Sequence, residues 1–236
     1  MTQVAKDDMA RRLDAFVDAA FAFAVTLLIV GGGDTPERFS DLSAMLLRAP
    51  AFAAAFALIS MFWLGYRDLG RLWRHRDGLS TALSLAIVFV VLLYVFPLRF
   101  IMEAALHALS GGWLPGTQLA ETLQEQRYLY VAYGAGCLVL SVLYATLYRH
   151  HRGQGEPTPD QALTASIWIS NWSILAGVSG VSMLMAAAAP DDLASWAPGV
   201  VYMVIGPLIG LSMALRFGRR SRPEAPGAVD TGGTTP

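Results

Sequence analysis

Two aspartates stand at the start of the first long apolar run of the chain, and packing alone does not account for them. Asp14 and Asp18 precede a run that ends near Val30. Carboxylates in the first turns of a helix are stabilised by the positive end of its dipole. An ionisable group placed inward in a membrane helix is a functional-site candidate. The simpler alternative is that both acids only pair with Arg11 or Arg12.

Apolar residues follow the two aspartates at helical spacing. One stripe of this expected helix holds Phe16, Ala20, Phe23, Leu27 and Val30, and a neighbouring stripe holds Ala19, Ala22 and Thr26. Such a stripe can pack against other helices, with the alanines allowing close approach. It can also line a pore and close it by dewetting. Periodicity alone leaves both interpretations open.

The elements that position these residues are expected to be membrane helices. Of the 236 residues, 55% are hydrophobic and only 15% are charged, whereas a soluble domain carries about 25% charged residues. The apolar residues form segments near the ~20 residues that cross a bilayer. We expect six transmembrane helices, at about 13–31, 49–66, 79–98, 128–148, 162–189 and 196–217. The predicted fold class is therefore an all-α polytopic membrane protein.

The arginines predict the orientation of these spans. Most of the 17 basic residues fall on one side if the N-terminus is cytoplasmic, which the positive-inside rule favours. An even number of spans then places the C-terminus in the cytoplasm as well. We expect a six-helix membrane domain over 1–217 and a disordered cytoplasmic tail over 218–236, which is rich in Pro, Gly and Thr.

Several kinds of chemistry find no support in the sequence. The chain has one cysteine, Cys137, inside an apolar run, and the adjacent His150 and His151 do not share a helix face, so no metal site is predicted. We expect both histidines to be solvated at the membrane interface. The net charge of −1 predicts no nucleic-acid partner. Because no P-loop, HExxH or GxSxG motif occurs, we predict neither an enzyme nor a cofactor.

Six spans invite comparison with voltage-gated channels, but the machinery of those channels is missing from the sequence. The fourth apolar segment has no ladder of arginines, and no TVGYG filter sequence occurs. The connection between the fifth and sixth segments, at 190–195, is too short for a re-entrant pore loop.

A motif in the first segment suggests a different kind of channel. Arg12, Phe16 and Asp18 stand at the spacing R-x-x-x-F-x-D, and a small, apolar run containing Thr26 follows. This stretch resembles the first helix of the transmembrane protein 175 family, which are potassium channels of lysosomes and bacteria without the usual selectivity filter. The resemblance extends through the sequence FWLGYR at 62–67 and covers about the first 100 residues.

The resemblance implies a homotetramer with a central pore lined by the first helix of each subunit and K⁺ as the permeant ion. It implies a hydrophobic constriction formed by Phe23, Leu27 and Val30. The pore-lining residues would also include Thr26, Ala19 and Ala20. A network that ties the helix to its neighbours would consist of Arg12, Phe16, Asp18 and Trp63.

Three departures from the family pattern leave other functions open. Val17 replaces the motif serine, Phe23 replaces an aliphatic residue at the narrow point, and Tyr66 and Arg67 stand where relatives have histidines. One alternative is a non-conducting membrane protein of the same fold with a structural or partner-binding role. Another is a secondary transporter. The only predicted partners are the bilayer and further copies of the chain, and the arginine-rich, alanine-rich composition favours a bacterial inner membrane.

Overall fold

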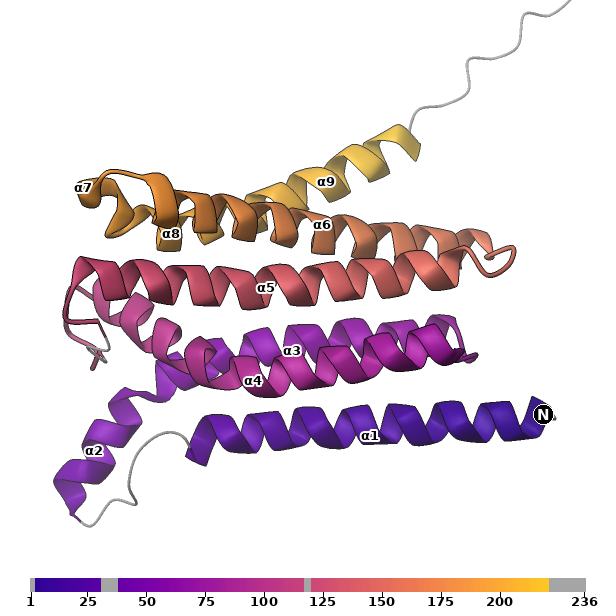
Figure 1. The fold of residues 1–236 in the computed structure, drawn as a ribbon, viewed down its shortest axis with the longest axis horizontal. Helices are drawn as coiled ribbons and strands as arrows, with labels where there is room; N and C mark the ends of the chain where they lie inside the picture. The colour runs from indigo at the N-terminus through magenta and orange to yellow at the C-terminus, as the bar shows by residue number, and fades with distance from the viewer. Residues whose placement is uncertain (1–2, 31–37, 117–119, 221–236) are drawn as a thin grey trace, which may run out of the picture.

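The structure is a computed structural model, and it describes residues 3–30, 38–116 and 120–220. Five long helices lie alongside one another, and a sixth, interrupted segment runs beside α6 (Figure 1). The helices of these residues are, in chain order, α1 (Gln3–Val30), α2 (Phe39–Leu47), α3 (Ala49–Leu72), α4 (Gly78–Leu109), α5 (Leu123–Arg152), α6 (Pro159–Ala188), α7 (Asp191–Ala194), α8 (Ala197–Val200), the 3-10 helix η1 (Val201–Val204) and α9 (Ile205–Arg220).

The predicted all-α fold with six spans is confirmed. Within the described ranges, six helical segments are long and apolar enough to cross a membrane, and each overlaps one predicted segment. Helix α4 continues to Leu109, past the expected end near 98, although Pro97 lies inside it. An internal proline removes one helical hydrogen bond and bends a helix, and α4 changes direction along its length (Figure 1). The short helix α2 was not predicted.

Three of the long helices begin with the same kind of side-chain cap. The N-cap residues Asp77, Thr122 and Thr158 each accept a hydrogen bond from the backbone N–H three residues later, at the starts of α4, α5 and α6. A cap of this type satisfies one of the backbone donors that the first turn of a helix leaves unpaired. The polar caps therefore set where each span begins, while the apolar runs set its length.

Aromatic side chains join α3, α5 and α6 in the core. Tyr144 and Tyr148 of α5 donate hydrogen bonds to the backbone carbonyls of Phe62 and Gly65 in α3, both at 2.7 Å. The rings of Tyr144 and Trp172 stack with their centroids 4.4 Å apart. The two hydrogen bonds hold the tyrosines in place and pair their hydroxyls in an apolar interior.

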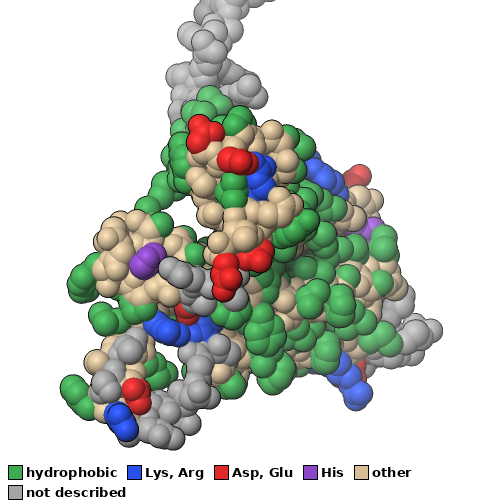
Figure 2. All heavy atoms as spheres, turned by 60° about the vertical axis from the view of Figure 1, so that its left-hand side comes forward, with side chains coloured by type: hydrophobic (Ala, Val, Ile, Leu, Met, Phe, Trp, Pro, Cys, Tyr) green, Lys and Arg blue, Asp and Glu red, His purple; other side chains and the backbone are tan. Residues whose placement is uncertain are grey.

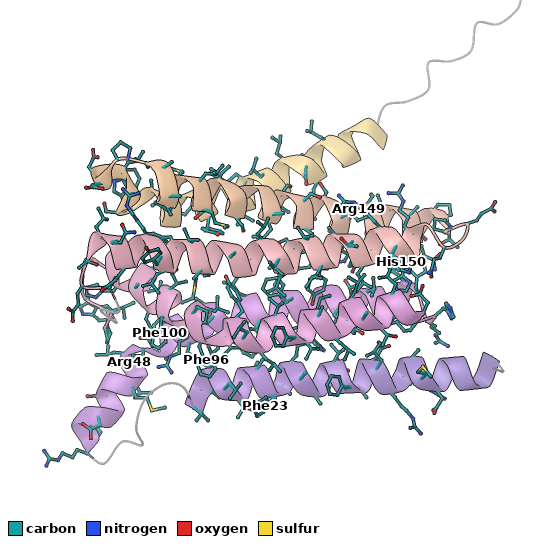
Figure 3. The ribbon with its side chains drawn as sticks, viewed as in Figure 1. Phe23, Arg48, Phe96, Phe100, Arg149 and His150 are labelled. Carbon is teal, nitrogen blue, oxygen red and sulfur yellow. The ribbon has the colours of Figure 1, made fainter. Side chains whose placement is uncertain are left out.

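The ends of α1 and α9 identify one end of the bundle. The N-terminal end of α1 and the C-terminal end of α9 lie at the same end of the bundle (Figure 1), as an even number of spans requires. Arg149 and His150 lie toward that end and Arg48 toward the opposite one (Figure 3). Hydrophobic side chains cover much of the flank of the molecule (Figure 2). Which end faces the cytoplasm stays a prediction, with the N-terminus inside.

The C-terminal boundary of the membrane domain also stays a prediction. Helix α9 continues to Arg220, three residues beyond the expected end of the domain at 217. The rest of the predicted tail, 221–236, lies outside the described residues.

Candidate functional site

Helix α1 packs against the bundle along one face only. Its buried residues from Val17 onward follow one another at intervals of four, three and four, and none is more than 4% exposed: Val17, Phe21, Ala24 and Leu28. They face α3 and α4, the two helices with which α1 makes most of its contacts. Because an α-helix has 3.6 residues per turn, burial of this stripe turns the opposite face away from the bundle.

The exposed face of α1 carries most of the predicted pore residues. We define the outward stripe as the exposed residues at alternating intervals of four and three: Arg12, Phe16, Ala19, Phe23, Thr26 and Val30. The side chains of Phe23 and Val30 are 55% and 68% exposed. Leu27 and Ala20 are instead half-buried and pack against the core cluster. The structure therefore separates the three predicted constriction residues, with Phe23 and Val30 facing outward and Leu27 at the edge of the packed face.

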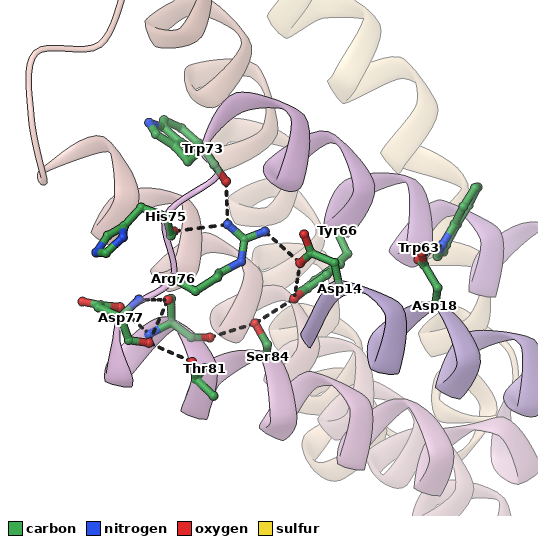
Figure 4. Close-up of polar contacts among 11 residues, drawn as sticks. Asp14, Asp18, Trp63, Tyr66, Trp73, His75, Arg76, Asp77, Thr81 and Ser84 are labelled. Carbon is green, nitrogen blue, oxygen red and sulfur yellow. Dashed lines mark hydrogen bonds and ion pairs between the residues drawn. The ribbon is translucent and has the colours of Figure 1, made fainter. Parts of the chain in front are cut away.

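One predicted pair of the motif network is present in the structure. The indole Nε1–H of Trp63 in α3 donates a hydrogen bond of 2.9 Å to Oδ1 of Asp18 (Figure 4). The other two predicted members lie elsewhere. Arg12 pairs with Asp8, one turn earlier in α1, at 3.1 Å, and Phe16 lies exposed on the outward stripe. Within one subunit, Arg12 and Phe16 therefore do not join the pair of Asp18 and Trp63.

Asp14, the other candidate aspartate of α1, has a partner that the sequence did not indicate. Asp14 forms an ion pair with Arg76 of the segment between α3 and α4, and Nη2 of Arg76 lies 3.1 Å from Oδ1 of Asp14. The same carboxylate oxygen accepts a hydrogen bond from the hydroxyl of Tyr66, at 3.3 Å. That hydroxyl also lies 3.1 Å from the hydroxyl of Ser84 in α4 (Figure 4). The alternative pairing of Asp14 with Arg11 or Arg12 is therefore wrong.

Arg76 is held by its own linker as well as by α1. Its side chain is only 1% exposed, and Nη1 donates to the backbone carbonyls of Trp73 and His75, at 2.6 and 3.3 Å. A buried guanidinium needs such partners, because an unpaired charge in a low-dielectric interior is costly. The arginine therefore connects α1 to the turn between α3 and α4. The sequence did not indicate this role, because Arg76 looks like one of several exposed arginines of the linker.

Asp14 and Asp18 together fix how α1 is rotated about its own axis. They stand four residues apart and so lie on the same side of the helix. Asp14 pairs with the linker and Asp18 with α3. Polar contacts are directional, so the two pairs add an angular restraint to the apolar packing of the buried stripe. The result is the outward orientation of Phe23 and Val30.

The other side of the α3–α4 linker is tied to the end of α5. Oδ2 of Asp77 lies 2.7 Å from Nε2 of His150 and 2.7 Å from Nε2 of Gln154. Burial acts to raise the pKa of Asp77, but hydrogen bonds from Ser80, His150 and Gln154 outweigh it and hold that pKa well below its ordinary value. The linker therefore contacts both α1 and α5 through charged groups.

The expectation that both adjacent histidines are solvated at the interface is wrong for His151. This residue is only 2% exposed, and its ring stacks on the indole of Trp73 with the centroids 5.6 Å apart. His150 is partly buried and contacts Asp77. This packing was not predicted because the partner, Trp73, belongs to a linker that looks like an exposed basic segment in the sequence.

Metal ligands do not gather in the described residues. No group of three or more His, Cys, Asp or Glu side chains there is arranged to hold a metal ion. What the described residues do present is one apolar, outward-facing helix whose rotation is fixed by two carboxylates.

Comparisons with known proteins indicate a family and a fold for the chain. The sequence profile of the family described as "Endosomal/lysosomal potassium channel TMEM175" matches residues 12–97, so the family resemblance predicted from the motif is confirmed. A protein of Marivirga tractuosa described as "Potassium channel" is 31% identical over 143 residues, which are 58% of this chain. The aligned region spans only 57% of that relative.

The fold itself has a solved counterpart. A crystal structure of a variant of the potassium channel MtTMEM175, in complex with a nanobody–MBP fusion protein, superposes with a TM-score of 0.73. The match covers 88% of this chain and 93% of that one at 22% identity. At this identity the match establishes the shared fold, which includes the second half of the chain, beyond the part that the sequence profile matches.

Proposed function

We propose, on the premise that residues 12–97 belong to the TMEM175 potassium-channel family, that the protein is a potassium-selective channel whose pore is lined by α1 of four subunits. The observation that carries the proposal is the outward stripe of α1. It is exposed in the single chain although it is mostly apolar. We place the assembly in the inner membrane of a bacterium, with both ends of the chain in the cytoplasm.

The spacing of the outward stripe suits a symmetric helix bundle. Its residues follow one another at alternating intervals of four and three, which is the pattern of residues along the seam of packed helices. Small residues, Ala19 and Thr26, alternate along the stripe with the larger Phe23 and Val30. Small residues allow membrane helices to approach closely. A helix that faced only lipid would need neither feature.

In a bundle of four such helices around one axis, Phe23 and Val30 would each form an apolar ring. Phe23 and Val30 are seven residues apart, about 10 Å along the helix axis. Between them lies Thr26, whose hydroxyl donates to the backbone carbonyl of Ala22 at 3.1 Å. An apolar constriction excludes water until it widens and can therefore gate ion flow. In this arrangement Leu27 would contact the neighbouring subunit at the edge of the pore.

The departure of Val17 from the family motif does not change the proposed pore. Its side chain is fully buried on the packed face of α1, opposite the outward stripe. The valine therefore replaces a serine hydroxyl by core packing and leaves no polar group unpaired. Phe23 is the departure that bears on conduction, since its ring would stand in the ion path.

The second candidate function is a non-conducting membrane protein of the same fold. The observation that favours it is the bulk of Phe23, because four phenyl rings at one level could seal the axis permanently. In that case the outward stripe would serve assembly alone.

Potassium efflux from liposomes tests the choice. The purified protein is reconstituted, and K⁺ and Na⁺ fluxes are compared for the wild type and Phe23→Ala. The matched control is Phe89→Ala, since Phe89 is also exposed, at 67%, but belongs to α4. We expect K⁺ flux above Na⁺ flux in the wild type, more flux in Phe23→Ala and no change in Phe89→Ala. A folded tetramer that passes no K⁺ in any variant would refute conduction and favour the second candidate.

A further inference from the structure

A cavity of about 270 Å³ lies where the α3–α4 linker meets the connection between α5 and α6. Its wall includes Trp73, Arg74 and His75 of the linker, and His151 and Glu156 on the other side. The cavity is distinct from the outward stripe of α1, and neither the proposed pore nor the contacts of α1 account for it. Its position at the ends of four spans places it at the level of the membrane surface.

One buried polar atom in the wall of this cavity has no hydrogen-bond partner. His151 is 2% exposed and lines the cavity, yet its Nε2 is unpaired. Buried polar atoms are nearly always paired, so an unpaired one calls for a missing water or ligand. In the tautomer that carries its proton on Nε2, the imidazole can donate to an acceptor in the cavity.

The charges around the cavity indicate that the acceptor is anionic. Arg74 and His75 belong to its wall together with one acid, Glu156, and all three are exposed. The carboxylate of Asp77 does not line the cavity and is hydrogen-bonded to His150 and Gln154. Arginine and imidazole donors that converge on one anion suit a phosphate, which offers several strong acceptor oxygens.

We propose that this cavity binds a phosphate group, carried either by an anionic lipid head group or by a soluble phosphate. Arg74 supplies the fixed positive charge, and His151 supplies a ring N–H after a small movement of its partly closed wall. The Trp73 indole holds the imidazole in place by stacking. The volume admits a phosphate together with part of the group to which it is esterified.

The bound phosphate would act on α1 through the linker. The backbone carbonyls of Trp73 and His75, both wall residues, accept hydrogen bonds from Arg76, and Arg76 holds Asp14 of α1. A ligand that moves the linker therefore moves the charge that fixes the rotation of α1. This regulatory part rests on the proposed channel function, whereas phosphate binding does not.

Phosphate binding is tested on the full chain in nanodiscs of a phosphate-free galactolipid. Inorganic phosphate is titrated into the wild type, Arg74→Gln, His151→Phe and the control Arg152→Gln, which removes an exposed arginine outside the cavity wall. We expect one saturable site per subunit, with affinity reduced roughly tenfold or more in Arg74→Gln and His151→Phe and unchanged in the control. No saturable binding, or equal binding by all four proteins, would overturn the proposal.

A second arm identifies the source of the phosphate. Phosphatidylglycerol is added to the nanodiscs in increasing proportion while inorganic phosphate binding is measured. Competition by the lipid assigns the cavity to a head group, and unaltered phosphate binding assigns it to a soluble phosphate. Either result supports the site.

Potassium flux tests the coupling to α1 separately. Phosphate should change the flux of the wild type by about fivefold or more. In Asp14→Asn the flux should no longer respond, while phosphate still binds. If the K⁺ flux of the wild type is the same with and without bound phosphate, the proposed coupling to α1 is overturned. A wild type that binds phosphate but never conducts would refute the proposed channel function and leave the binding site standing.

Discussion

Arg76 and Asp14 are 62 residues apart in sequence and form the ion pair that joins α1 to the rest of the bundle at its N-terminal end. Nη2 of the arginine lies 3.1 Å from the carboxylate, and the arginine side chain is 1% exposed. Asp18 makes a second polar contact one turn further along α1, with Trp63. These two contacts, together with the buried apolar stripe, orient α1 in the bundle.

Removing the charge of Asp14 should destabilise the fold. Asp14→Asn leaves the buried guanidinium of Arg76 without its carboxylate, which should cost about 1–3 kcal/mol. The thermal midpoint in mild detergent should therefore fall by several degrees. The control is Asp8→Asn, because Asp8 forms only exposed pairs with Arg11 and Arg12. Equal midpoints for the two variants would show that the buried pair does not anchor α1.

The contact between Trp63 and Asp18 should contribute less, but measurably. Trp63→Phe keeps an aromatic ring and removes the N–H that donates to the carboxylate. We expect a loss of about 1 kcal/mol and a lower thermal midpoint. Trp113→Phe is the control, since Trp113 is 75% exposed. An unchanged midpoint in Trp63→Phe would mean that this hydrogen bond contributes nothing to the stability of the fold.

A methyl group at Gly65 should be poorly tolerated. A Cβ there would lie 2.7 Å from Cζ2 of Trp172, and this ring stacks between neighbours in the core and has little freedom to move. Gly65→Ala should destabilise the protein by about 1–3 kcal/mol. The matched control is Gly177→Ala in α6, where a Cβ meets open space and the alanine favours the helix. If both variants melt alike, α3 and α6 are not packed as closely as the structure shows.

Acid should weaken the link between the α3–α4 linker and α5. Because the pKa of Asp77 is lowered in the folded protein, its charge stabilises the fold above the ordinary carboxyl pKa of about 4. That contribution is lost as the pH falls below this value. We expect the thermal midpoint of the wild type to exceed that of Asp77→Asn at pH 7, with the gap closing toward pH 3. A gap that stays constant over this range would assign the effect to the cap geometry and not to the charge.

The sequence predicted the spans well because the bilayer imposes a simple rule on them. Length and apolarity alone located the run that became α3, and the confirmed family resemblance followed from three residues at fixed spacing, Arg12, Phe16 and Asp18. Helix α2 was missed because nine residues between two spans give too short a periodic signal. The continuation of α4 past Pro97 to Leu109 was not part of the predicted span, since the packing of neighbouring helices decides whether an internal proline ends a helix.

The partners of the charged residues were harder to predict. Trp63 was expected near Asp18 from the family motif, and the structure shows the pair. The pairing of Arg76 with Asp14 depends on how the linker folds back over α1, which no local pattern encodes. His151 was placed in solvent for the same reason, because its stacking partner Trp73 is distant in sequence. Long-range pairing of this kind becomes visible only once the helices are arranged.

The central claim is that the outward stripe of α1 lines an ion path, and thiol accessibility tests it most directly. Cys137, the one cysteine of the chain, is first replaced by serine. Phe23→Cys is then introduced, with Phe89→Cys as the control on α4. Potassium flux is measured before and after a charged, membrane-impermeant methanethiosulfonate reagent. Modification should change the flux through Phe23→Cys strongly and leave Phe89→Cys unaltered. If both variants conduct K⁺ and modification changes the flux through neither, the result contradicts the pore assigned to α1.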